Sequence, residues 1–318
     1  MYFPQFDRSV LHLEPIGNRR HLLDVSCILP LVPTKEIAGE IKAISSHIIA
    51  AKESGAAVVL MMGAHVLRSG VQKYIIDLLE KGYLNCIAMN GAGIIHDFEF
   101  SLIGATTESV SEYIRKGQFG LWKETGKIND IVKSAAEEDM GLGEAVGKFI
   151  MEKDLPYNDS SVLAAAYRCG CPVTVHVGIG YDIPHEHPNC DGAAYGKTSY
   201  IDFLRFAGII ESLEGGVVMN FGSAIMAPEV YLKALAMVRN KAFQAGKKIT
   251  KFATLVCDLA ALPDDYRKEA SAKGHDYYFR PWKTMLVRTV AEEGVSFYVQ
   301  GKHRDTVPQL WTAINDRA

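Results

Sequence analysis

Residues 58–99 read VVLMMGAHVLRSGVQKYIIDLLEKGYLNCIAMNGAGIIHDFE, and this stretch decides the fold class. The unbroken apolar run over 58–62 predicts a buried strand, which Gly63-Ala64-His65 ends. Apolar residues at helical spacing predict a helix over 66–80, and a second strand over 84–89 runs into Asn90-Gly91-Ala92-Gly93. A strand–helix–strand unit with small residues after each strand is typical of an open α/β sheet, whose ligands bind at the carboxyl edge.

The same alternation resumes in the second half of the chain. Apolar runs predict strands over 172–179, 216–220, 251–256, 285–290 and 295–299, and the spacing between them predicts helices, among them 200–213 and 228–239. This alternation predicts an α/β fold: a Rossmann-like, mostly parallel sheet with helices on both faces. Residues 1–33 hold four prolines and are expected to form an N-terminal arm, followed by a single domain over 34–318.

Composition narrows the function classes. The chain has 318 residues, of which 48% are hydrophobic and 22% charged, as in globular proteins with a substantial core. A net charge of −3 and the lack of a Lys/Arg block argue against nucleic acid as a partner. No run approaches the ~20 apolar residues of a membrane span, and the N-terminus lacks a signal-peptide pattern. We expect a cytoplasmic protein without membrane contact, with its six cysteines reduced.

Small residues follow three of the predicted strands. Gly91, Ala92 and Gly93 would let a ligand approach the backbone, and a helix start after them would favour a phosphate. Gly222 and Ser223 close another strand in the same way. The alternative is a set of tight turns without a ligand. The full G-x-G-x-x-G fingerprint is absent, so the ordinary Rossmann mode of dinucleotide binding is not expected.

A long polar loop follows the strand predicted over 172–179. His176, Asp182, His185 and His187 lie close together in the sequence, and long loops of this kind at strand ends are commonly functional. The His-x-His spacing with a nearby carboxylate can form a metal site. A polar lining of a substrate site, or a subunit contact, is the alternative. The turn over 301–305, GKHRD, could neutralise a phosphate or simply be a solvated turn.

Residues 58–99 resemble the cofactor-binding part of the deoxyhypusine synthases, through Gly63-Ala64-His65, Ser69-Gly70 and Asn90-Gly91-Ala92-Gly93. Weaker matches continue along the chain, including Cys171-Pro172-Val173 and Phe279-Arg280-Pro281-Trp282-Lys283. The resemblance implies a homotetramer with a Rossmann-like, NAD-binding domain. In that family NAD takes a hydride from spermidine, and a lysine holds the aminobutyl group as an imine. The acceptor amine is a lysine of a translation factor, or putrescine in the related homospermidine synthases.

The resemblance also implies roles for individual residues. It implies that Lys283 forms the imine and that His96 and Asp97 assist catalysis, although Asp97 could simply favour a helix start and Lys283 could lie on the surface. It implies cofactor binding by Gly63, Ala64, Ser69, Gly91, Ala92, Gly93, Gly222 and Ser223. For substrate binding, the polar loop itself favours His176, Asp182, His185 and His187, and the matched lysine segment adds Trp282. Where the family has a Lys-His-His turn this chain reads Asn220-Phe221-Gly222-Ser223, so its substrate groups match less well than its scaffold.

These observations lead to one principal hypothesis and three alternatives. The principal hypothesis is an NAD-dependent transferase that moves an aminobutyl-type group from a polyamine to an acceptor amine through Lys283. A homospermidine synthase-like enzyme with a small-molecule acceptor is a close variant. A metal-dependent hydrolase or lyase built on His176, His185 and His187 belongs to another class. A ligand-binding protein that has lost catalysis is the last alternative.

Overall fold

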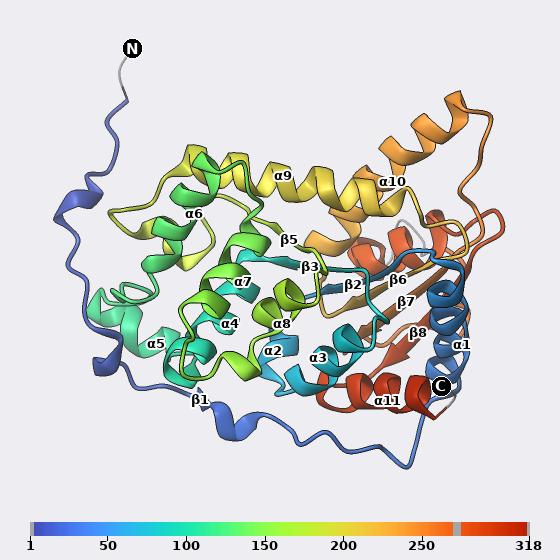
Figure 1. The fold of residues 1–318 in the computed structure, drawn as a ribbon, viewed down its shortest axis with the longest axis horizontal. Helices are drawn as coiled ribbons and strands as arrows, with labels where there is room; N and C mark the ends of the chain where they lie inside the picture. Colours follow the sequence, from blue (N-terminus) through green and yellow to red (C-terminus); the bar gives the residue numbers. More distant parts are fainter. Residues whose placement is uncertain (1–2, 270–274, 317–318) are drawn as a thin grey trace.

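Six parallel strands form the centre of the protein, in a computed structural model that describes residues 3–269 and 275–316 (Figure 1). The strand order is β5-β3-β2-β6-β7-β8, and every neighbouring pair is parallel. The predicted α/β fold with a Rossmann-like parallel sheet is confirmed. The strands are β2 (Val58–Met62), β3 (Cys86–Asn90), β5 (Val173–His176), β6 (Val217–Phe221), β7 (Ala253–Asp258) and β8 (Val295–Gln300).

Helices cover both faces of the sheet because its strands are apolar on both sides. Alternate residues such as Leu60 and Met62 face one helix layer, whereas Val59 and Met61 face the other. The first layer consists of α1 (Gly39–Ser54), α2 (His65–Arg68), α3 (Gln72–Glu80), α4 (Gly91–Ile103), α6 (Lys127–Glu137), α7 (Leu142–Glu152), α8 (Val162–Arg168) and α11 (His303–Asn315). The second layer consists of α9 (Gly192–Ile210), α10 (Met226–Gln244) and a π-helix (Pro281–Arg288).

The N-terminal segment runs along the outside of this body before α1 begins (Figure 1). Its strand β1 (Leu23–Asp24) pairs antiparallel with β4 (Ala105–Thr106), just before the short helix α5 (Val110–Tyr113). Arg19 is its main anchor, since its guanidinium donates two hydrogen bonds to the buried Glu99 carboxylate, at 2.9 and 2.8 Å. Further along, the Leu29 amide donates to the Gly70 carbonyl at 2.8 Å.

Three elements differ from the sequence prediction. The helix predicted over 66–80 is broken at Gly70, which has φ of +76° and lies so close to the Cys27 carbonyl that a side chain would collide with it. Gly91 and Gly93 lie inside the first turn of α4 rather than in a turn before it. The strand predicted over 285–290 is wrong. Residues 285–288 belong to the π-helix and the next two form a turn, because Trp282, Met285 and Leu286 pack on the sheet at helical spacing.

Within the described part of the chain, no helix combines the length and the apolar character that crossing a membrane requires.

Candidate active site

The sheet reverses its direction of growth between β2 and β6. The chain builds outward from β2 to β3 and β5, and then restarts at β6 on the other side of β2 (Figure 1). Ligands of open α/β sheets bind outside the carboxyl ends of the strands at such a switch point. Gly63 and Gly222 follow the two strands there, and the Gly63 amide donates to the Phe221 carbonyl at 2.9 Å.

The glycines at the switch point are required by packing between turns. A side chain at Gly63 would collide with the Gly222 carbonyl, and one at Gly222, whose φ is +66°, would collide with the His303 imidazole. The two serines also bond within their own turns: the Ser69 hydroxyl donates to the His65 carbonyl at 2.7 Å, and the Ser223 hydroxyl accepts from the Ala227 amide at 3.0 Å. Ala64 lies between Gly63 and α2 and is half-buried. These residues therefore shape the edge of the sheet, whether or not a ligand binds there.

Side-chain nitrogen atoms gather around this edge. Arg68 Nη1 lies 3.1 Å from His65 Nε2, and His303 lies against Gly222. Arg68 Nε and His303 Nδ1 are both buried and have no hydrogen-bond partner among the described residues. Burial lowers the pKa of His303 and of His65, so Arg68 carries the positive charge near neutral pH. The sequence indicated only the 301–305 turn, and Arg68 gave no signal because a single arginine in a helix is usually a surface residue.

The start of α4 meets the long loop that follows β5. The Asn90 side chain caps the helix by accepting from the Gly93 amide at 3.3 Å, and Ala92 lies between the two glycines of this first turn. A side chain at Gly91 would collide with the Asp182 carboxylate. Asp182 is 7% exposed, and its Oδ2 has no hydrogen-bond partner among the described residues. Burial raises the pKa of Asp182 to about 7.

A pocket of about 250 Å³ opens beside Asp182 in the same loop. Its lining combines two carboxyl groups, Asp182 and Glu186, with the aromatic rings of Tyr181 and Phe119. Carboxylates and aromatic faces are the groups that bind protonated amines. The pocket is therefore suited to a cationic ligand, whereas the switch point offers donors to an anionic one.

The histidines of this loop do not converge on one point. His187 donates from Nε2 to the Gly120 carbonyl at 2.8 Å, and His176 Nε2 lies 3.1 Å from the Thr174 hydroxyl. His185 Nδ1 accepts from the Asp182 amide at 3.3 Å. Across residues 3–269 and 275–316, no three His, Cys, Asp or Glu side chains lie together as metal ligands would. The hydrolase or lyase hypothesis thus lacks a ligand set in this geometry.

His96 and Asp97 both have partners within the fold. Asp97 is fully buried and accepts from the Ser161 hydroxyl at 2.5 Å and from the amides of Val162 and Leu163, which anchors the first turn of α8. Burial raises the pKa of Asp97 to about 6. His96 Nδ1 lies 2.8 Å from the Thr106 hydroxyl, and burial lowers its pKa to about 4. These contacts favour a structural role for Asp97 and leave His96 as a neutral imidazole.

Lys283 lies on the opposite face of the sheet from His96 and Asp97. The π-helix that carries it packs with α10, whereas α4 packs in the other helix layer. Lys283 is 6% exposed, and its Nζ lies 3.7 Å from the centroid of the Tyr277 ring. The neighbouring Trp282 is buried and donates from Nε1 to the Tyr266 carbonyl at 2.6 Å. The fold therefore does not group the three predicted catalytic residues, although Lys283 is enclosed.

The fold of this chain is similar to that of several solved structures. No protein-family model and no curated protein matches the sequence. A solved structure described as a LOR/SDH protein from Methanococcus maripaludis S2 is 14% identical with a TM-score of 0.52, over 90% of this chain and 72% of that chain. AgrE in complex with ornithine and NAD+ is 13% identical with a TM-score of 0.51, over 89% of this chain.

At these identities the likeness establishes a shared fold and not a shared reaction. This chain spans only 34% of the AgrE chain, about a third of its length. A protein described as a deoxyhypusine synthase from Entamoeba histolytica is 10% identical with a TM-score of 0.41, over 89% of each chain. That similarity is remote. The class that fold and site define is thus an α/β protein whose six parallel strands have the Rossmann order.

Proposed function

We propose that this chain is an NAD-dependent enzyme that acts on an amine, with the dinucleotide at the switch point between β2 and β6. One observation carries the proposal: the buried Nε of Arg68 and Nδ1 of His303 have no hydrogen-bond partner among the described residues, at the edge where such sheets bind nucleotides. A diphosphate offers acceptor oxygens to the N–H groups of Arg68 and to the His303 tautomer that is protonated on Nδ1, and the guanidinium also supplies charge. NAD would supply the acceptor for a hydride.

The amine would bind in the pocket beside the start of α4. Asp182 and Glu186 would accept hydrogen bonds from its ammonium group, and the Tyr181 and Phe119 rings would contact its charge and its methylene groups. Asp182 would bind the ammonium group most strongly when its carboxyl group is ionised. Because burial raises the pKa of Asp182 to about 7, amine binding should strengthen as the pH rises through neutrality and the carboxyl group loses its proton.

The finer proposal is a transferase of the deoxyhypusine synthase type. Lys283 would carry the aminobutyl-type group as an imine, and a homotetramer would bring further groups to the site. The enclosure of Lys283 against Tyr277 supports this proposal, because it holds the amine in one place. The acceptor could be a protein lysine or a small diamine, as in the homospermidine synthases. His96 and Asp97 lie on the far face from Lys283, so they would act on it only indirectly.

Titration of the full chain with NADH, followed by the fluorescence of the nicotinamide, tests the cofactor site. We expect saturable binding, and we expect Arg68→Gln to weaken it about tenfold through loss of a charge-assisted contact. Arg168→Gln is the matched control, since Arg168 forms an exposed ion pair with Glu80 at 2.7 Å. Absence of binding by the unmodified chain would refute the cofactor proposal.

Reduction with borohydride in the presence of NAD and spermidine tests the lysine. We expect a covalent adduct on Lys283 that mass spectrometry of proteolytic peptides can locate, and Lys283→Met should abolish it. Lys251→Met serves as the control because Lys251 is an exposed residue paired with Glu293. An adduct that persists in the Lys283 variant would exclude Lys283 as the residue that forms the imine. That result would not contradict the proposed NAD site.

A further inference from the structure

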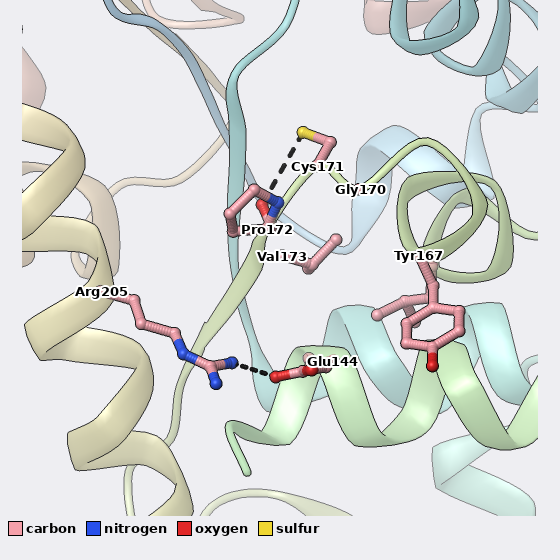
Figure 2. A pocket seen from close by; sticks show the side chains of 9 residues that line it. Glu144, Tyr167, Gly170, Cys171, Pro172, Val173 and Arg205 are labelled. Carbon is pink, nitrogen blue, oxygen red and sulfur yellow. Dashed lines mark hydrogen bonds and ion pairs between the residues drawn. The ribbon is translucent and has the colours of Figure 1, made fainter.

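A cleft of about 300 Å³ lies at the amino-terminal end of β5, at the opposite end of that strand from the candidate active site (Figure 2). Its walls come from α7, α8 and α9. The half-buried side chains of Tyr167, Cys171 and Pro172 give it a largely apolar surface, and Figure 2 shows the Tyr167 ring on the side away from α9. Its size and apolar lining suit a small organic molecule.

One end of the cleft carries a pair of opposite charges. Arg205 of α9 donates from Nη1 to Oε2 of Glu144, which lies in the first turn of α7 (Figure 2). The two side chains are 38% and 35% exposed. This bond uses one of the five N–H groups of the guanidinium and one carboxylate oxygen. The other groups of both side chains make no further hydrogen bond to the described residues, so they can bind a ligand.

A buried carboxylate holds the wall behind this ion pair. Asp202, one turn before Arg205 on α9, accepts from the Gly143 amide at 3.0 Å and from the Val175 amide at 2.9 Å. A side chain at Gly143 would collide with the Val173 carbonyl, so α7 lies directly against the edge of β5. The elements that carry Arg205 and Glu144 are thus tied to the same strand edge, and the cleft is formed before a ligand binds.

We propose that this cleft binds a free α-amino acid with an apolar side chain. The ammonium and carboxylate groups of an amino acid are separated by about the span of an ion pair. Laid antiparallel to Arg205 and Glu144, the ligand carboxylate faces the free N–H groups of Arg205 and the ammonium faces Glu144. The carboxylate and the ammonium of the ligand then each face one side chain of opposite charge. The side chain of the ligand packs on Tyr167 and Pro172, which are half-buried in the lining of the cleft.

The charge pair also excludes ligands that carry one charge. A carboxylate alone would meet Arg205 but be repelled by Glu144, and an amine alone would meet Glu144 but be repelled by Arg205. The cleft opens at the amino end of β5, so its occupant is distinct from the substrate of the reaction proposed above. Amino-acid binding in this cleft does not depend on whether the protein binds NAD.

Isothermal titration calorimetry with L-leucine tests this inference. We expect L-leucine to bind, and we expect 4-methylpentanoate and 3-methylbutylamine, which each lack one charged group, to bind at least about tenfold more weakly. Arg205→Gln and Glu144→Gln should each weaken L-leucine binding about tenfold. Lys197→Gln is the matched control: Lys197 lies on the same helix as Arg205 but outside the cleft, and it forms an ion pair with Asp139 at 2.6 Å.

Three results would overturn the inference. The first is no binding of L-leucine, L-methionine or L-phenylalanine at concentrations of about 10 mM. The second is equal binding of L-leucine and the two singly charged analogues. The third is unchanged L-leucine binding by both folded variants, with circular dichroism to verify the fold. Should a variant fail to fold, the analogue comparison on the unmodified chain decides alone.

Discussion

Asp97 and Asp182 are both buried carboxyl groups, and their surroundings give them different roles. Asp97 receives three hydrogen bonds from the start of α8, so its charge is compensated inside the fold. Asp182 has an unbonded oxygen against the start of α4 and lines a pocket. The family resemblance implied a catalytic role for Asp97, and the polar loop after the strand predicted over 172–179 favoured a ligand role for Asp182. Only their hydrogen-bond partners separate them.

The raised pKa of Asp182 predicts a pH-dependent stability. Its pKa is 3.8 in an unfolded chain and about 7 in the fold. As pH rises from 4 to 7, the unfolded state releases this proton first, so the folded state loses stability over that window. The Asp182→Asn variant should have the same free energy of unfolding as the unmodified protein near pH 4. At pH 8 its free energy of unfolding should be higher by on the order of 2 kcal/mol. Urea denaturation at both pH values measures the difference.

Asp191 provides the control for this experiment. It caps α9 in the same loop, and hydrogen bonds from the Ala194 amide hold its pKa below the usual value. Asp191→Asn should therefore change stability by an equal amount at all pH values above 5. An Asp182→Asn variant with the same flat difference would contradict the burial of an ionisable carboxyl at position 182.

At the scale of elements, the local sequence predicted all six strands of the main sheet, but it also predicted a false strand over 285–290 and missed helix boundaries. The apolar run over 58–62 predicted β2 residue for residue, because a strand buried on both faces must be continuously apolar. The break between α2 and α3 was missed, because the apolar periodicity continues through it. Gly70 breaks the helix to let the N-terminal arm approach, and that contact joins residues far apart in the sequence.

A comparison of Gly70 with Gly82, which has a similar backbone angle, distinguishes backbone strain from packing as the reason for glycine at this break. Gly70 has φ of +76° and the Cys27 carbonyl against it, whereas Gly82 has φ of +67° and no atom within 4 Å of where a methyl group would lie. Gly82→Ala should destabilise by about 1 kcal/mol, from backbone strain alone. Gly70→Ala should lower the free energy of unfolding by about 3 kcal/mol, since the methyl group must also displace the N-terminal arm. Chemical denaturation compares the two, and equal losses would exclude a packing role for Gly70.

At the scale of the whole molecule, one buried ion pair attaches the arm to the domain. Arg19 and Glu99 are separated by 80 positions, and both side chains are 2% exposed. The Glu99 carboxylate also accepts from the hydroxyls of Thr106 and Thr125, at 2.7 Å each, so the pair joins the arm to three parts of the body. Nothing in the local sequence around either residue indicates this pairing.

Replacing Arg19 alone should destabilise the protein more than replacing both Arg19 and Glu99. Arg19→Met leaves the Glu99 charge buried without its cation, which should destabilise by about 3–5 kcal/mol. The double variant Arg19→Met with Glu99→Met should recover part of that loss, because neither charge remains to be desolvated. Thermal and urea unfolding of both variants measure the effect. A double variant less stable than Arg19→Met would show that the network contributes more than charge compensation.

The sequence alone determined the fold class of this protein and the positions of the small residues that follow its parallel strands. Those features depend on local apolar periodicity and on small residues after strands, which a single segment displays. The tertiary structure decided which of the polar residues meet: Lys283 and Asp97 fall on opposite faces, and Arg68 and His303 fall on the same edge. Such groupings depend on strand order and on contacts across the whole chain, which no local pattern encodes.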